Sequence, residues 1–172
     1  MELNYEKCHE LFEIDKGCLI RRVDTKGTAK AGTMAGTLNN GYLHVRVDGS
    51  RAYVHQVIFF MTHGYIPAYI DHIDGNKLNN RPENLRESTS SKNACNALKK
   101  AGGSSQYKGV SWDKKRCMWR AGIKVNGKSF NLGDYKCESK AAEMVDKATR
   151  GSYGEHGTYN FPREGERSCL RN

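Results

Sequence analysis

Residues 69–96 constrain the fold of this chain more than any other segment. They open with a short apolar run that delivers the adjacent polar pair Asp71 and His72. Residues 74–80 are rich in Gly, Asn and Asp, which favour turns because they tolerate left-handed backbone and bond locally. Residues 82–86 predict a second short extended piece, and the Ser-Thr pair that follows can cap a helix. The segment therefore predicts a strand, a loop, a short strand and a helix.

The polar residues of this segment suit one kind of chemistry. Asp71 supplies an anionic hard oxygen and Asn93 a neutral one, which favours Mg²⁺ or Mn²⁺ over zinc. His72 can exchange a proton near neutral pH. Neighbours on a strand point to opposite faces, so the strand must bend if Asp71 and His72 are to act on one water. A metal ion and a base acting together describe metal-assisted phosphodiester hydrolysis.

The spacing of these residues identifies a resemblance. Asn84 stands twelve residues after His72, and Asn93 nine residues after Asn84. With the Asp71-His72 pair, this pattern resembles the HNH nucleases of phage and homing-endonuclease type, with Asn in place of the final His. The resemblance implies the ββα-metal (His-Me finger) fold. In that fold Asp71 and Asn93 would hold one divalent ion, Mg²⁺ or Mn²⁺, His72 would activate water, and Asn84 would orient His72.

The resemblance covers roughly residues 10–98 and includes His55, an auxiliary residue for which a structural role at a helix start is an equal alternative. Family members usually have Arg where Gln56 stands, so a phosphate contact is not carried over to that position. Asn80 and Asn96 are interpreted as structural. Among the polar residues of the segment, the one we expect to contact DNA is Arg86.

A hairpin and a helix are expected to support this segment. Residues 42–47 and 51–54 alternate around Asp48-Gly49, a strong hairpin turn. Residues 56–63 are apolar enough for a buried helix, stopped by Gly64.

Composition restricts the class of protein. The 172 residues are 37% hydrophobic and 27% charged, and no stretch approaches the roughly 18 apolar residues of a membrane span. The first residues lack the pattern of a secretory signal, which predicts a cytoplasmic protein, of a bacterial host if the chain is phage-encoded. The six cysteines contain no Cys-x-x-Cys pair and are expected to be free thiols.

The charge is unevenly distributed. Residues 1–98 hold 12 Lys/Arg and 11 Asp/Glu, whereas residues 99–172 hold 16 and 8, so most of the net charge of +9 lies in the second part. Such a basic part commonly binds nucleic acid. Residues 99–105 have the composition of a flexible linker. We therefore expect a nuclease domain at 1–98, a second domain at 106–162, and a disordered tail at 163–172.

The second domain shows a repeated strand pattern. Residues 118–125 and 128–133 alternate around Asn126-Gly127, a preferred hairpin turn. With a strand near 107–112 and an amphipathic helix over 138–149, the pattern predicts three antiparallel strands packed on one helix, in an α+β protein. Strand parity places one set of side chains against the helix: Trp119, Ala121, Ile123, Val125, Phe130 and Leu132.

The motifs Tyr107-Lys108-Gly109-Val110, Trp119-Arg120-Ala121, Asn126-Gly127-Lys128 and Asn160-Phe161 resemble the APETALA and ethylene-response-factor DNA-binding domain. The resemblance spans residues 105–162 and implies that the exposed sheet face enters the DNA major groove. Ser111 and Ser129 fall where plant members have Arg, so their target preference is not carried over. The DNA contacts expected here are Lys108, Lys114, Lys115, Arg116, Arg120, Lys124 and Asn131.

Together these features predict a monomeric, metal-dependent DNA endonuclease, phage-encoded and homing-type, that a C-terminal domain tethers to double-stranded DNA, with neither membrane nor protein partner. Two alternatives stay open: a DNA-binding regulator with an inactive nuclease domain, and an RNA-binding or RNA-processing protein.

Overall fold

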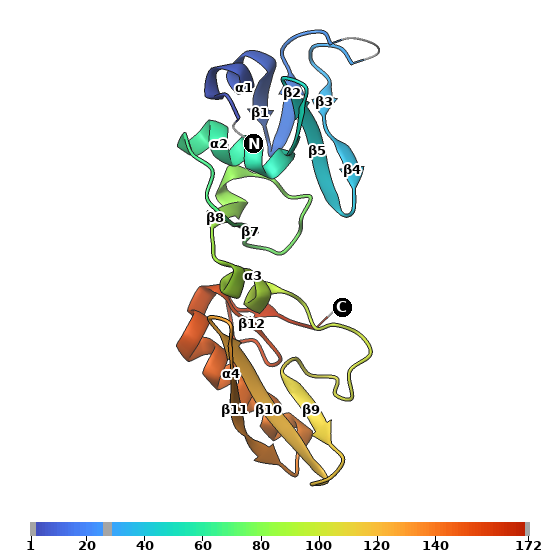
Figure 1. Ribbon diagram of the computed structural model, residues 1–172, viewed down its shortest axis with the longest axis vertical. Helices are drawn as coiled ribbons and strands as arrows, with labels where there is room; N and C mark the ends of the chain where they lie inside the picture. The colour runs from blue at the N-terminus through green and yellow to red at the C-terminus, as the bar shows by residue number, and fades with distance from the viewer. Residues whose placement is uncertain (1–2, 26–28, 171–172) are drawn as a thin grey trace. The chain divides into compact units, whose positions relative to one another are not determined.

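A computed structural model describes residues 3–25 and 29–170 of the chain. It contains two compact units, Met1–Ser88 and Thr89–Asn172 (Figure 1). The chain thus divides ahead of the predicted linker at 99–105, which belongs to the second unit.

The first unit begins with a helix and a three-stranded sheet. Helix α1 (Tyr5–Leu11) starts where the Asn4 side chain accepts a hydrogen bond from the Lys7 amide at 2.8 Å. It leads into a sheet of β1 (Phe12–Asp15), β2 (Cys18–Arg21) and β3 (Met34–Ala35), in that order. Residues 26–28, between β2 and β3, lie outside the described part of the chain.

A second sheet carries the predicted hairpin. Its order is β4 (Thr37–Asn39), β5 (Tyr42–Val47) and β6 (Ser50–Tyr53), and Asp48 and Gly49 both have positive φ at the turn. Helix α2 (Val54–His63) follows at once, two residues earlier than predicted, and ends at Gly64 in the left-handed conformation. The hairpin and the helix are confirmed.

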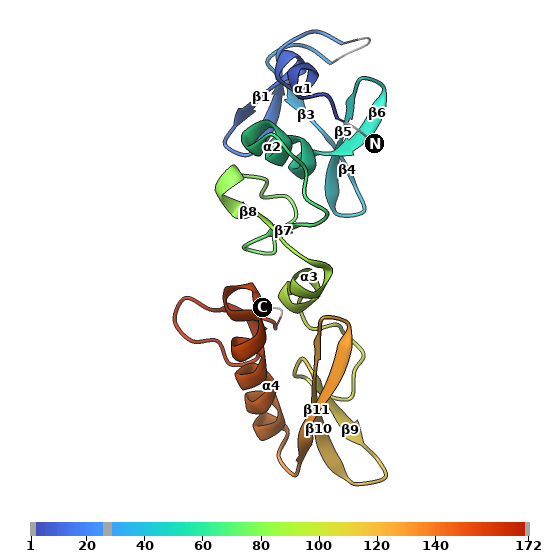
Figure 2. The same ribbon diagram turned by 60° about the vertical axis from the view of Figure 1, so that its left-hand side comes forward.

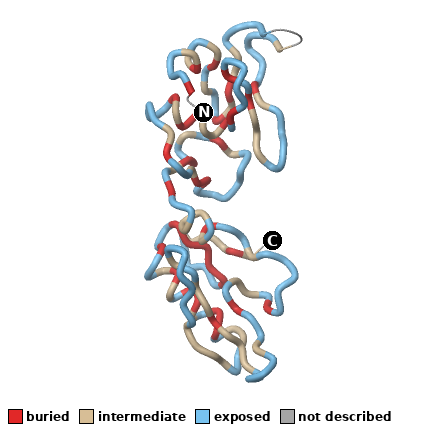
Figure 3. The backbone as a smooth tube through the Cα atoms, in the orientation of Figure 1, coloured by how far each residue is buried: buried red, intermediate tan, exposed pale blue. Residues whose placement is uncertain are grey.

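Helix α2 forms the centre of the first core. Val57 and Ile58 are fully buried, and residues from α1 and from both sheets pack around them. Figure 3 colours buried residues red, and most of the residues of α2 from Val54 to Met61 are among them or partly buried.

The segment after α2 follows the predicted order with one correction. Strand β7 (Ile70–His72) pairs antiparallel with β8 (Leu85–Glu87). Residues Pro82–Asn84, expected to be extended, instead form the 3-10 turn η1. Proline at the first position of this turn explains the change, because its fixed φ suits helical geometry and it has no N–H to leave unpaired.

The second unit begins with α3 (Ser90–Asn96), capped by the Thr89 hydroxyl. Strands β9 (Val110–Asp113), β10 (Met118–Val125) and β11 (Lys128–Tyr135) form an antiparallel sheet in the order β11-β10-β9. Helix α4 (Glu138–Tyr153) packs along it (Figure 2). The predicted three strands on one helix are confirmed.

One core prediction in this sheet is wrong. Phe130 is 49% exposed, and neither Ile123, its partner across the strands, nor Val125 belongs to the buried cluster. The register shifts between Ala121 and Gly122, so that Ala121 pairs with Gly133 but Gly122 with Asn131. Such a bulge breaks the strict alternation on which a parity argument depends.

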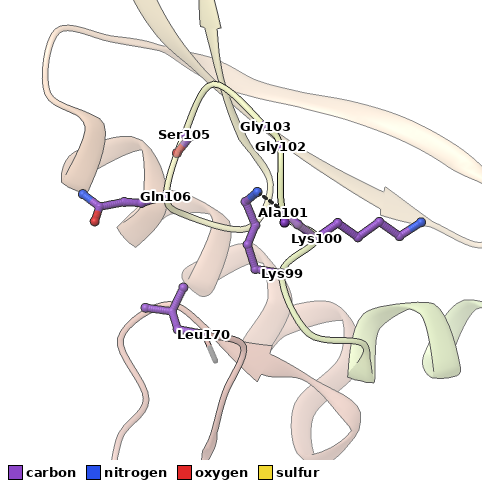
Figure 4. A pocket seen from close by; sticks show the side chains of 8 residues that line it. All are labelled: Lys99, Lys100, Ala101, Gly102, Gly103, Ser105, Gln106 and Leu170. Carbon is purple, nitrogen blue, oxygen red and sulfur yellow. Dashed lines mark hydrogen bonds between the residues drawn. The ribbon is translucent and has the colours of Figure 1, made fainter. Parts of the chain in front are cut away.

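The predicted linker and tail are both ordered parts of the second unit. Residues 99–103, 105 and 106 and Leu170 line a pocket of about 440 Å³ (Figure 4). The Lys99 amide donates to the Cys169 carbonyl at 2.7 Å, and the Ser105 hydroxyl donates to Glu138 at 2.7 Å. After η2 (Gly154–His156), β12 (Thr158–Tyr159) pairs in parallel with β13 (Arg167–Ser168).

Cys169 is fully buried, so the tail is structured as far as Leu170; its last two residues lie outside the described part. The predicted disorder is wrong because Glu166 binds Arg150 at 2.7 Å through two oxygens. These bonds lower the pKa of Glu166 to about 2.

All six cysteines are free, as predicted. Within residues 3–25 and 29–170, no helix has the length and apolarity needed to cross a membrane.

Candidate nuclease site

Strand β7 separates the two residues that the sequence places side by side. Asp71 lies opposite Arg86 on β8, and His72 lies opposite Leu85. Both side chains are buried, Asp71 at 7% and His72 at 5% exposure. They meet different neighbours, as the alternation of a strand requires.

A buried asparagine holds the imidazole of His72. The Oδ1 atom of Asn80 lies 3.0 Å from Nε2 of His72, and Asn80 is only 2% exposed. Its Nδ2 atom faces the carbonyl of Leu78 at 3.4 Å. Because that carbonyl can only accept, the amide is oriented with Oδ1 towards the imidazole. In the neutral tautomer that fits this contact, Nε2 carries the proton and Nδ1 the lone pair.

Asn84 has other partners. Its Oδ1 accepts from the Asp74 amide at 3.0 Å, and its Nδ2 donates to Asp74 Oδ1 at 2.9 Å and to the Asn79 carbonyl at 2.7 Å. The expectation that Asn84 bonds the imidazole is therefore not met. Asn84 instead fixes the loop that carries Asn80, whose Oδ1 contacts the His72 ring.

Asp74 is the anchor of the same loop. It also accepts from Asn79 Nδ2 at 2.7 Å and from the Asn76 amide at 2.8 Å. Burial alone would raise the pKa of Asp74, but the bonds from Asn79, Asn84 and the Asn76 amide outweigh it and hold that pKa below its ordinary value. The carboxylate is thus kept charged as an acceptor for the loop.

The β1–β2 turn supports this loop from the other side. Gly17 has φ +82°, and a Cβ there would lie 2.6 Å from the backbone nitrogen of Arg81. Only glycine allows both the left-handed backbone and this approach. The turn therefore fits against the residue that follows Asn80.

Arg86 is engaged inside the unit. Its Nε and Nη2 atoms lie 3.1 and 3.0 Å from Oδ2 of Asp71, and its side chain is 15% exposed. The sequence assigned Arg86 to DNA, whereas the structure gives its guanidinium to the carboxylate predicted to bind metal. Charge pairing between directly opposed residues of β7 and β8 explains the contact.

The donor set fits a hard divalent ion only in part. Asp71 supplies a carboxylate oxygen from the first unit, and Asn93, in α3, would supply an amide oxygen from the second unit. No group of three or more His, Cys, Asp or Glu side chains suited to a metal ion occurs within the part of the chain that the structure describes. The pairing of Asp71 with Asn93 stays a prediction.

His55 belongs to a cluster of rings around His72. Its ring centroid lies 5.2 Å from that of His72, 5.2 Å from that of Tyr53 and 5.6 Å from that of Tyr42. Burial, with help from His72 and His44, lowers the pKa of His55 to about 3. His55 is therefore neutral near pH 7, and any contact it makes with a phosphate is a hydrogen bond.

Lys108, predicted to contact DNA, is used within the second unit. Its ammonium donates to the Cys95 and Ala97 carbonyls and, at 2.9 Å, to the Thr158 hydroxyl. Burial lowers the pKa of Lys108. Two of these acceptors lie in the segment of α3 and the third lies in β12, so only folding brings them to Lys108.

Arg120 and Arg116 share an acidic partner on the sheet. Arg120 binds Asp113 at 2.6 Å and Asp134 at 3.1 Å, and Arg116 also binds Asp134. Their charges are thus balanced on the face predicted to meet DNA. The remaining expected DNA contacts are exposed: Lys114, Lys115, Lys124 and Asn131.

Comparison with known proteins bears directly on this site. Residues 52–95 match the HNH endonuclease family. The match runs from the end of β6 through α2, β7 and β8 into α3, and it contains His55, Asp71, His72, Asn80 and Asn84.

Two viral proteins are similar over longer stretches. Protein 3.8 of Escherichia phage T7 is 40% identical over 80 residues, 45% of this chain and 66% of that protein. An uncharacterized HNH endonuclease of Acanthamoeba polyphaga mimivirus is 31% identical over 119 residues, 67% of this chain and 61% of that protein. The chain spans less than two thirds of the length of these relatives. No solved structure matches it significantly.

Proposed function

We propose that this chain is an HNH-type, metal-dependent DNA endonuclease of a phage. The observation that carries the proposal is the buried bond between His72 and Asn80 inside the HNH-matching segment. It holds a histidine in one tautomer and one orientation, which is the arrangement a general base requires.

In this proposal Nδ1 of His72 takes a proton from the attacking water. Asn80 keeps the other nitrogen protonated, and Asn84 with Asp74 keeps Asn80 in place. Asp71 and Asn93 would hold Mg²⁺ or Mn²⁺, one ion per active site. Such an ion supplies charge stabilisation for the phosphate and lowers the pKa of bound water. Arg86 must then share Asp71 or release it.

The second unit is proposed to tether the protein to double-stranded DNA as a domain of the APETALA and ethylene-response-factor type. Three antiparallel strands under one helix and the exposed Lys114, Lys115 and Lys124 support this. We further propose that the protein is a homing-type monomer in the cytoplasm of a bacterial host.

A plasmid-cleavage assay tests the activity. Wild-type protein with Mg²⁺ or Mn²⁺ should cut duplex DNA, and EDTA should stop it. His72→Ala should lose about 10²–10⁴-fold in rate while keeping its DNA affinity. His63→Ala, an exposed histidine in α2, is the matched control. Equal cutting by His72→Ala would refute the assignment of the base.

One observation favours a second candidate, a DNA-binding protein with an inactive nuclease unit. Asp71 is paired with Arg86, and a cation at 3.0 Å competes with a metal ion for the same oxygen. Binding of duplex DNA without cleavage, in either metal and across salt concentrations, would select this candidate.

A further inference from the structure

The first unit carries a basic pocket that the candidate nuclease site does not include. It has a volume of about 770 Å³, and four of its lining side chains are cations: Lys7, Arg21, Arg46 and Arg51. One carboxylate, Asp48, lines it as well. This concentration is notable because residues 1–88 hold 11 Lys/Arg and 11 Asp/Glu and are neutral as a whole.

Two of these cations face each other without an acid between them. Arg46 on β5 lies directly opposite Arg51 on β6, and both are exposed. The Arg51 side chain forms no hydrogen bond or ion pair with any residue that the structure describes, and the Arg46 side chain reaches only the Gly49 carbonyl at 3.4 Å. Like charges directly opposed across strands destabilise a hairpin. An anion bound between them would remove that repulsion.

The other two cations are held by the fold. Arg21 donates to the Thr33 hydroxyl at 3.1 Å and to the Met34 carbonyl, and Lys7 pairs with Glu10 at 2.9 Å. They add positive potential to the pocket, whereas the guanidinium N–H groups of Arg46 and Arg51 can donate hydrogen bonds to a ligand.

A row of rings connects this pocket with His72. On the same face of the hairpin as Arg46 and Arg51, His44 lies opposite Tyr53, with ring centroids 4.4 Å apart. Tyr53 stacks on His55 at 5.2 Å, and His55 meets His72 at 5.2 Å. The row of rings therefore leads from His44, which lines the basic pocket, to the proposed base within one unit.

We infer that Arg46 and Arg51 bind the phosphate backbone of the duplex DNA whose scissile phosphate lies at His72. This inference rests on the proposed function. Arg46 lies four residue steps along β5 from Tyr42, about 13 Å, and Tyr42 itself adjoins His72. Duplex DNA advances about 3.4 Å per base pair, so the contacted phosphates lie about four to six nucleotides from the cut.

The test compares the full-length wild type with the double variant Arg46→Gln/Arg51→Gln. Binding is measured with His72→Ala added to both proteins, so that the DNA is not cut during the measurement. The double variant should bind duplex DNA roughly 30-fold more weakly at 0.15 M salt, and its log–log salt slope should fall by about 1.8. The rate at saturating DNA should change less than the affinity. Arg22→Gln, an exposed arginine of the same unit that does not line the pocket, should leave both unchanged.

Two readouts separate binding from structure. The melting temperature of the double variant should stay the same or rise slightly, because a repulsive pair is removed. Neutral methylphosphonate linkages four to six nucleotides from the cut should weaken wild-type binding and have little further effect on the double variant.

Wild-type affinity and slope in the double variant would overturn the inference and leave the nuclease proposal standing. Equal loss in Arg22→Gln, or a loss seen with RNA and not with DNA, would also overturn it. A wild-type protein that neither binds nor cuts duplex DNA would refute the proposed function, and the inference with it.

Discussion

At the scale of single residues, the position of one amide decides how the proposed base works. Asn80→Ala removes the acceptor that keeps His72 Nε2 protonated and should lower kcat by up to about 10²-fold. Asn80→Asp keeps an oxygen at the same place and should recover part of that loss. The measurement is kcat beside DNA affinity in both variants; equal kcat in wild type and Asn80→Ala would contradict a positioning role.

A second residue-scale prediction concerns His55. Its pKa of about 3 in the folded protein lies below the ordinary 6.5, so the unfolded chain binds the additional proton as pH falls. The contribution of neutral His55 to the free energy of unfolding is complete above pH 6.5 and is lost progressively as the pH falls towards 3. At pH 4.5 His55 should therefore cost up to about 3 kcal/mol of stability.

His55→Gln should reduce the loss of unfolding free energy between pH 7 and pH 4.5, measured by denaturant unfolding at both pH values. His63→Gln, which changes an exposed histidine of the same helix, should leave that loss as it is in wild type. A wild-type loss in His55→Gln would contradict the effect of burial on His55.

At the scale of elements, the loop between β7 and β8 depends on Asn84. Three hydrogen bonds from one buried amide link it to Asp74 and Asn79. Asn84→Ala leaves these groups unsatisfied and should lower the free energy of unfolding by about 1–3 kcal/mol. Turnover should fall as well, because Asn80 loses its support. Thermal unfolding and kcat measure the two effects, and a stable variant with full turnover would contradict both.

The C-terminal segment is a second element, and it is an ordered part of the second unit rather than the predicted free tail. Removal of residues 163–172 deletes β13, the buried Cys169 and the Glu166 partner of Arg150. The melting temperature of the second unit should therefore fall by several degrees, as expected for a loss of about 1–2 kcal/mol in a small domain. Removal of residues 171–172 alone serves as the control. An unchanged melting temperature in the longer truncation would restore the prediction of a free tail.

At the scale of the whole molecule, the division of the chain sets which fragments fold. Helix α3 belongs to the second unit: Ser91 bonds the Tyr153 hydroxyl at 2.6 Å, and the Cys95 carbonyl accepts from Lys108 and Thr158. A fragment 89–172 should fold cooperatively, whereas 106–172, which starts at the predicted domain boundary, should melt at a lower temperature. Circular dichroism of both fragments checks this, and equal melting temperatures would place the boundary at the predicted linker.

The sequence by itself determined the elements whose signals are local. The Asp48-Gly49 and Asn126-Gly127 turns, the apolar run of α2 and the spacing of Asp71, His72 and Asn84 each lie within one short, continuous stretch of sequence, so pattern and turn chemistry suffice. These signals located both hairpins, helix α2 and the candidate nuclease segment.

Tertiary structure alone decided which partner each polar group takes. Asn80 rather than Asn84 bonds His72, Arg86 bonds Asp71, and Lys108 bonds carbonyls of the α3 segment. It also decided that residues 99–105 and 163–170 are ordered. The physical reason is the same in each case: a hydrogen bond is satisfied by whichever group folding brings within reach, and a buried polar group left without a partner is costly. Residue type and spacing state what a side chain can bind, but only the fold brings its partner to it.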